Sequence, residues 1–397
     1  MEQAHADNSR PSGLHIPRPE ATETQFFLQR VRWQLFTIFF PEVTVSLAAE
    51  QWESANQGVA KFKELGHPWW SQRHAFFADM GGIVLESPGF PPFPIDWQQL
   101  AYLVENGYVP MPNITNDDIA DKSKADGFAR ALAVVQIVWF TLQCVGRWAQ
   151  NLGLCTLELS TLAFIFCSLN MQYFWYFKPY DIRSPFVIHT EYPMRTVLLQ
   201  AGDAARHPYS RTPLDFVKPP PDDRSLIAPF WFGVESIISV LEDRGRRPIR
   251  CFSNHKTMPP AGITARERLY GVFLELFYFG LHFMGLLLEF PSRVERALWV
   301  AANGTLTTLL VVYMIAIYVG HKVQARFGMW LFGKKTESIM GLIEVMPRWA
   351  KVIIHGPFIF VYVIARGYVL VEGFLGLRAL PPKLFVTVEW ANFLLHL

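Results

Sequence analysis

Charged residues are scarce in this sequence, where they make up 18% of 397 residues. A soluble domain usually carries about 25%. The shortage is concentrated in a few windows, which is typical of proteins with several membrane-spanning helices. The net charge is only +2. Bulk electrostatics therefore gives no case for nucleic acid as a partner.

Cysteine is scarce as well, with four residues: Cys144, Cys155, Cys167 and Cys251. No two of them have the spacing of a metal site, and we expect buried, reduced side chains that pack as small apolar groups. The sequence also lacks HExxH, GxSxG, a Walker A loop and a GxGxxG turn. We therefore predict neither a bound metal nor a cofactor.

Apolar residues are abundant, at 51%, and aromatic residues reach 15%. The apolar runs predict an all-α polytopic membrane helical bundle of about six transmembrane helices, with the lipid bilayer as its partner. A disordered polar tail is predicted for 1–30, and a single membrane domain for 31–397. Two large polar loops, 50–128 and 178–268, interrupt it. The candidate spans are 31–49, 129–148, 154–177, 269–290, 297–320 and 352–371.

The first candidate span is the weakest, because Pro41 and Glu42 lie in its middle. A carboxylate at the centre of a bilayer costs about 2.5–3.5 kcal/mol on insertion scales. Two interpretations stay open. The segment is either a kinked span with Glu42 facing protein, or an interfacial segment.

Six spans would place both chain ends on one side of the membrane. The basic residues that follow the fifth span, such as Lys322 and Arg326, fall on the other side together with loop 178–268. The positive-inside rule then predicts that the large loops are cytosolic. In this topology the sequon Asn113-Ile-Thr115 stays unmodified. We expect a multi-pass protein of the endoplasmic reticulum or another endomembrane.

Acidic residues cluster where Asp117, Asp118 and Asp121 spell DDxxD. This spacing can hold Mg²⁺ against a diphosphate. Capping explains it more simply, because Thr115 is a good N-cap and acids are favoured in a first helical turn. Asp121 remains a candidate polar group at the mouth of a cavity. Upstream, His74 and Asp79 lie in an aromatic segment, where they either do acid–base work or are structural.

Three ionisable residues recur every seven positions along the fourth candidate span: Glu275, His282 and Glu289. Seven residues are close to two turns, so the three share one helical face. Ionisable groups inside a span are costly and usually face the bundle interior. Arg366 and Glu158 are possible partners. The group is either a structural interhelical contact or a protonation site for a lipophilic substrate.

Several blocks of the sequence resemble a large fungal family of polytopic integral membrane proteins of unknown activity. The blocks include DKSKADG from Asp121, WFTLQC from Trp139, TLELSTLAF from Thr156 and KPYD from Lys178. Some members are encoded in gene clusters for specialised metabolites. In layout alone, the chain is also similar to membrane-bound terpene cyclases of meroterpenoid pathways, which protonate their substrates with intramembrane carboxylates.

The resemblance implies an accessory role in specialised, terpenoid-like metabolism, next to other membrane enzymes of a pathway. A first alternative is a membrane-bound cyclase or isomerase that protonates a lipophilic small molecule. Its catalytic candidates are Glu275 and His282, with Asp79 and Asp121 at the mouth. A second alternative is a transporter, sensor or scaffold.

Overall fold

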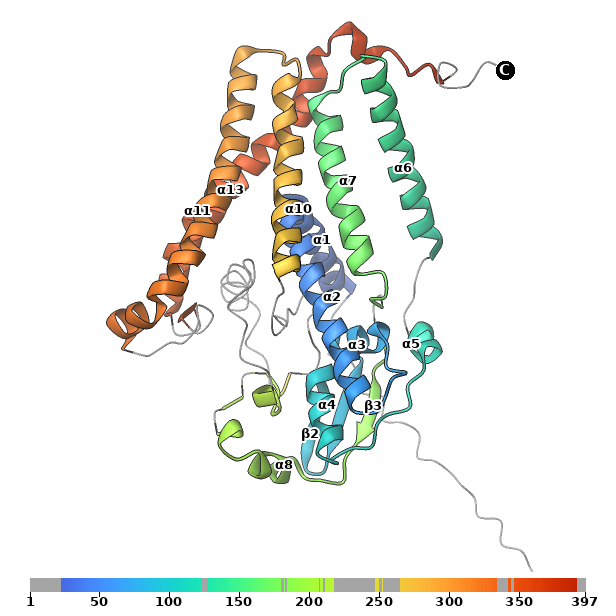
Figure 1. Cartoon of the computed structure of the whole chain (residues 1–397), viewed down its shortest axis with the longest axis vertical. Helices are drawn as coiled ribbons and strands as arrows, with labels where there is room; N and C mark the ends of the chain where they lie inside the picture. Colours follow the sequence, from blue (N-terminus) through green and yellow to red (C-terminus); the bar gives the residue numbers. More distant parts are fainter. Residues whose placement is uncertain are drawn as a thin grey trace, which may run out of the picture.

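The computed structural model describes residues 23–122, 127–179, 182, 184–206, 208–209, 211–217, 247–249, 252, 265–333, 342–343 and 346–390. Most of the predicted tail 1–30 and the centre of loop 178–268 lie outside this set. Long helices form a bundle at one end of the molecule, and short helices and strands form a head at the other (Figure 1).

Five helices alternate in direction through the bundle (Figure 1): α6 (Gly127–Ala149), α7 (Thr156–Phe174), α10 (Ala265–Phe283), α11 (Arg293–Phe332) and α13 (Arg348–Leu375). Four of them contain segments long and apolar enough to cross a membrane: Ala131–Ala149, Leu269–Leu287, Arg293–Gly320 and Trp349–Ala379. Many large apolar side chains on these helices are exposed, among them Leu276, Ile315 and Phe360. Such a surface is unfavourable in water and suited to lipid.

The predicted spans 129–148, 269–290, 297–320 and 352–371 overlap these four segments. The predicted span 154–177 forms α7, which packs between α10 and α13 but is not among the four. Its polar residues, such as Glu158 and Asn170, lower its mean hydropathy. The number of six spans is therefore not reached in the described residues.

The first predicted span, 31–49, is not one straight helix. α1 (Glu23–Phe39) and α2 (Pro41–Glu64) meet at Phe40. Trp33 on α1 packs against Leu47 on α2, whereas a straight helix would hold residues fourteen positions apart about 21 Å from each other. Pro41 has no backbone N–H and its ring crowds the preceding turn, which explains the bend.

The head contains a three-stranded sheet, so the prediction of an all-α fold was incomplete. The strands are β1 (Ile83–Ser87), β2 (Phe90–Ile95) and β3 (Phe186–His189), in the order β2-β1-β3. β2 is antiparallel to β1 and β3 is parallel to it. β2 was not predicted, because its run FPPFPI contains three prolines. They are tolerated because β2 is an edge strand, where a missing N–H costs no ladder bond.

Helices α3 (Gln72–Asp79), α4 (Trp97–Glu105), α5 (Asn116–Lys122) and α8 (Met194–Ala201) complete the head. Its core is apolar and includes Phe76, Ile83, Phe93 and Leu100. The second half of α2 belongs to this core through Phe62, while its first half packs in the bundle through Val45. One helix therefore joins the two parts of the molecule.

The end of the bundle away from the head is called the distal end below. It comprises the α6–α7 turn at 150–155, the 3-10 helix η3 (Met284–Leu287), and the segment 376–390 with η4 (Gly376–Ala379) and η5 (Pro382–Phe385). Arg147 near the end of α6 donates to the carbonyl oxygen of Leu384 at 2.9 Å and to that of Val386 at 3.0 Å.

Candidate functional site

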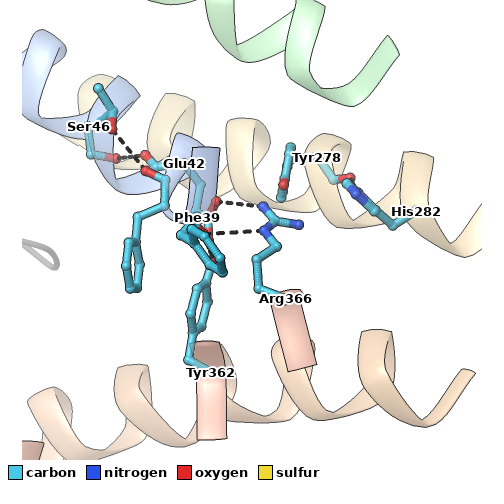
Figure 2. A network of polar contacts seen from close by, with 9 residues as sticks. Phe39, Glu42, Ser46, Tyr278, His282, Tyr362 and Arg366 are labelled. Carbon is cyan, nitrogen blue, oxygen red and sulfur yellow. Dashed lines mark hydrogen bonds and ion pairs between the residues drawn. The ribbon is translucent and has the colours of Figure 1, made fainter. Parts of the chain in front are cut away.

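A buried ion pair lies inside the bundle, between the start of α2 and the middle of α13. Arg366 Nη2 is 3.2 Å from Glu42 Oε2, and the two side chains are 1% and 8% exposed. The bend at Pro41 directs the first turn of α2 into the bundle, where Arg366 faces it (Figure 2). Glu42 thus faces protein, as one of the two interpretations expected, but neither α1 nor α2 is among the described helices long and apolar enough to cross a membrane.

The bend also supplies a backbone acceptor to the same cluster. Arg366 Nε donates to the carbonyl oxygen of Phe39 at 3.3 Å, and the hydroxyl of Tyr362 lies 3.1 Å from that oxygen. Tyr362 also donates to Glu42. Tyr362 and Arg366 are four residues apart on α13 and so project from one face. Two charges taken out of water need such additional hydrogen bonds to offset their desolvation.

Glu275 of α10 lines a cavity next to this pair. Glu42, Glu275 and Tyr362 line one cavity of about 60 Å³ between α2, α10, α11 and α13. The other lining residues are mainly apolar and aromatic: Phe40, Val43, Phe279, Leu306, Leu310, Tyr313 and Phe358. Oε2 of Glu275 is buried and has no hydrogen-bond partner. The cavity thus has a mainly apolar wall and contains a carboxyl group, one oxygen of which takes part in no hydrogen bond.

His282 lies two turns further along α10, on the distal side of Arg366. The guanidinium of Arg366 is 4.9 Å from the ring centre of Tyr278, and the Tyr278 and His282 rings are 4.7 Å apart. Figure 2 shows the side chains of Glu42, Arg366, Tyr278 and His282 following one another in space between α10 and α13. His282 Nδ1 is 3.0 Å from the carbonyl oxygen of Tyr278, so it carries the proton of that bond. Nε2 has no partner.

The predicted partner Glu158 and the third residue of the predicted face, Glu289, lie elsewhere. Glu158 accepts from the backbone N–H of Cys155 at 2.8 Å and lies 3.6 Å from Arg147, at the start of α7. Glu289 lies beyond the end of α10 and pairs with Lys383 at the exposed distal end. Glu289 therefore does not share a buried face with Glu275 and His282.

Asp79 lies at the junction of head and bundle, not at the cavity. Its Oδ2 accepts from Ser54 on α2 at 3.3 Å. Lys178, which follows α7, donates to Gln51 at 2.7 Å. Burial lowers the pKa of Lys178 to about 7, and the Asp79 carboxylate partly opposes this shift. Asp79 thus takes part in a polar cluster that joins α2, α3 and the end of α7.

The acidic motif and His74 have local structural roles in the head. Asp118 accepts from the N–H and the hydroxyl of Thr115, at 2.8 and 2.7 Å, which closes a capping box at the start of α5. This supports the capping interpretation. The backbone of Asp121 belongs to α5, but its side chain lies outside the described residues. His74 bonds Ser71 and the carbonyl oxygen of Ile114.

Glu275, His282 and Arg366 were candidates from the sequence, whereas Tyr362 and the pairing of Arg366 with Glu42 were not predicted. The pair joins residues far apart in the chain, and no periodicity within one helix connects them. The carboxylate beside Pro41 was the available signal, because a charge in an apolar run needs a partner.

A protein-family model matches residues 11–202 and 264–397, and it describes a family of unknown function, DUF8562. Neither the curated proteins nor the solved structures contain a significant match to the chain.

Proposed function

This chain belongs to the family of unknown function DUF8562, and we propose that it is an integral membrane protein that performs acid–base chemistry on a lipophilic molecule. Glu275 is the proposed proton donor and acceptor. The observation that carries the proposal is the cavity in which Glu275, with one unpartnered buried oxygen, faces an apolar and aromatic wall. Ionisable groups at such positions inside a bundle are functional candidates by default.

The size of the cavity limits the kind of ligand. About 60 Å³ holds a few water-sized groups, since one water needs roughly 10–15 Å³ by this measure. It accommodates the branched end of an isoprenoid-like chain and not a whole polycyclic product. The rest of such a molecule would remain among the apolar helices or in the bilayer. We therefore propose a long lipophilic substrate whose reactive end enters the cavity.

The proposed reaction is an isomerisation or cyclisation that needs no co-reactant. Glu275 in its carboxylic acid form donates its proton to one carbon of an alkene, whose π electrons form the new C–H bond. The neighbouring carbon becomes a cation, which the aromatic rings of Phe279 and Phe358 can stabilise. Loss of a proton from an adjacent carbon forms the new alkene and restores the acid at Glu275.

The Glu42–Arg366 pair and Tyr362 have a positioning role in this scheme. Arg366 is held by Glu42 and by the Phe39 carbonyl oxygen, so its charge stays at a fixed place near Glu275. A fixed cation stabilises the carboxylate that Glu275 becomes after it donates its proton. We place the protein in an endomembrane and, by its sequence resemblance, next to the enzymes of a specialised-metabolite pathway.

A scaffold is the second candidate, and the ion pair favours it. Arg366 and Glu42 join α13 to α2 inside an apolar core that also contains Tyr278 and Trp299. Such contacts can serve only to hold helices in register. In that case Glu275 would matter for assembly and not for a reaction.

Glu275→Gln separates the two candidates, because glutamine keeps the shape of the side chain but has no acidic proton. We expect unchanged protein levels in membranes and loss of a lipid-soluble metabolite, measured by comparing extracts with those of a gene deletion. Glu289→Gln, at the exposed distal end of the same segment, is the matched control and should leave the profile intact. An unaltered profile in Glu275→Gln would refute the acid–base role and leave the scaffold.

A further inference from the structure

Buried polar atoms without a hydrogen-bond partner continue from the cavity towards the distal end. On α10 they follow Glu275 through the next two turns. The others lie on α7, α11 and α13, from Arg366 beside Tyr278 to Glu295 and Glu372 at the distal end. The atoms are Glu275 Oε2, Tyr278 Oη and His282 Nε2; Trp299 Nε1, Asn303 Oδ1 and Glu295 Oε2; Ser160 Oγ; and Arg366 Nη1 and Glu372 Oε1. We call this set the polar column.

Contacts within and between the helices connect several members of the polar column. The rings of Tyr278 and His282 lie 4.7 Å apart, and that of His282 stacks 6.5 Å from that of Trp299. Trp299 is one turn along α11 from Glu295. The hydroxyl of Tyr368 lies 3.2 Å from both the Glu295 carbonyl oxygen and Glu372 Oε2.

The polar column ends at the distal surface. Glu295 pairs with Arg378, whose side chain is 52% exposed. Glu372 is buried at 1% exposure and lies beside Gly376. A Cβ atom at Gly376 would be 3.1 Å from Thr156 Oγ1 and 3.8 Å from Glu372 Oε1. A side chain at Gly376 would therefore crowd Thr156 and Glu372 at the distal end of the column.

So many unpartnered groups are unfavourable in a dry core. Each buried polar atom without a partner costs about 1–3 kcal/mol, and native proteins satisfy such atoms with other groups or with bound water. Among the described residues, no group of three or more His, Cys, Asp or Glu is placed to hold a metal ion. Water is the ligand that can both donate to the carboxylates and accept from Tyr278, Trp299 and Arg366.

We propose that the polar column binds a file of water molecules that connects Glu275 with the aqueous phase at the distal end. Its function is to carry protons. The proposed isomerisation returns its proton to Glu275, so the column does not supply a proton in every cycle. It supplies the proton that first converts the Glu275 carboxylate to the acid, one proton entering at the Glu295–Glu372 mouth for each carboxylate neutralised. The purpose rests on the proposed acid–base function, whereas the hydration of the column does not.

Cysteine accessibility tests the hydration directly. In a chain whose four native cysteines are replaced by serine or alanine, Ser160→Cys and Asn303→Cys each introduce one thiol into the column. The probe is a small, charged methanethiosulfonate added to the protein in lipid nanodiscs. Ser160→Cys is nearly isosteric, so it keeps the test valid where Asn303→Cys fails to fold.

Ala163→Cys is the matched control, since Ala163 lies one turn from Ser160 on α7, is 0% exposed and belongs to the apolar core of the bundle. We expect the two column thiols to react at least about tenfold faster than this control, because only a hydrated thiol ionises to the reactive thiolate. Leu199→Cys, on the exposed surface of α8, sets the upper limit of the rate.

The route by which water enters the column is tested with a bulkier side chain at Gly376. Gly376→Val, added to Ser160→Cys or Asn303→Cys, should slow labelling of the column thiol and leave Leu199→Cys unchanged. If the column thiols react as slowly as Ala163→Cys, the column is dry and the inference is wrong, whatever Glu275→Gln does to metabolites. If they react fast but Gly376→Val has no effect, water enters elsewhere and the distal path is wrong.

Discussion

At the scale of single residues, the most consequential feature is a pair of opposite charges in an apolar bundle. The side chains of Arg366 and Glu42 are both nearly inaccessible to solvent, so the charge of each is compensated by the other. Removing one partner of a buried pair is costly because it leaves an uncompensated charge, whereas replacing both by apolar groups is often nearly neutral. Tyr362 and the Phe39 carbonyl oxygen reduce the desolvation cost but carry no compensating charge.

A double-mutant cycle tests this dependence. We expect Arg366→Met alone to lower the free energy of unfolding by about 3–5 kcal/mol, and Glu42→Met to have a similar effect. The combined variant should recover more than half of the summed loss. The measurement is thermal unfolding of the purified protein in detergent.

The exposed pair of Lys383 and Glu289, at 48% and 59% side-chain exposure, is the control for this cycle. Lys383→Met should cost less than about 1 kcal/mol, because water screens a surface pair. Strictly additive losses in the Glu42 and Arg366 variants would mean that the two side chains are not energetically coupled.

At the scale of elements, the sequence predicted the long apolar helices and missed the features that depend on distant neighbours. Leu269–Leu287 and Trp349–Ala379 follow from length and hydropathy alone. β2 does not follow, because its three prolines oppose a strand. They are tolerated because β2 lies at the edge of the sheet and pairs with β1, which a local pattern does not reveal. The fold-back at Pro41 and the pairing of Glu42 with Arg366 also need contacts between segments that share no local pattern. The sequence therefore named Glu275, His282 and Arg366, but neither Tyr362 nor the arrangement of these side chains.

Helix α3 shows how one buried histidine makes an element sensitive to pH. This histidine is His74. Its Nε2–H donates to the Ile114 carbonyl oxygen at 2.9 Å, and its Nδ1 accepts from the Ser71 backbone N–H at 3.2 Å. A second proton at Nδ1 would break the bond to Ser71. Burial lowers the pKa of His74, the Ile114 carbonyl oxygen partly offsets this effect, and Arg73 adds to it. The folded head thus favours the neutral imidazole.

We therefore expect the head to lose stability as the pH falls. An unfolded histidine has a pKa of about 6.5, so at and below this pH the unfolded chain takes up a proton that the folded chain does not. The free energy of unfolding then decreases with falling pH, until the lowered folded-state pKa is passed. Thermal unfolding at pH about 7.5 and about 5.5, on either side of the ordinary histidine pKa, measures the effect.

His74→Gln is the variant for this comparison, because glutamine at the third helical position also completes a capping box. Its melting temperature should fall less between the two pH values than that of the wild type. His189→Asn, at a histidine with 72% side-chain exposure, should retain the wild-type pH dependence. Equal shifts in wild type and His74→Gln would assign the acid sensitivity to other groups.

At the scale of the whole molecule, the head and the distal end lie at opposite ends of a bundle with an apolar surface (Figure 1). β3, from the segment after α7, pairs with β1, from the segment before α6, so both polar segments build one head. A membrane around the bundle would leave the head on one side and the segment 382–390 on the other. The basic residues at the head end of α11, Lys322 and Arg326, favour the cytosol for that side.

Glycosylation distinguishes the two orientations, because the acceptor Asn113 is exposed on the head. With the head in the cytosol, the sequon Asn113-Ile-Thr115 stays unmodified, and the protein's mobility on a gel does not change after endoglycosidase treatment. A sequon fused after residue 397 through a flexible linker is expected to be modified, because 384–386 contact α6 at the distal end. Glycosylation at Asn113, with none on the fused sequon, would place the head in the lumen. The mouth formed by Glu295 and Glu372 would then open to the cytosol, and any proton supplied to Glu275 would come from there.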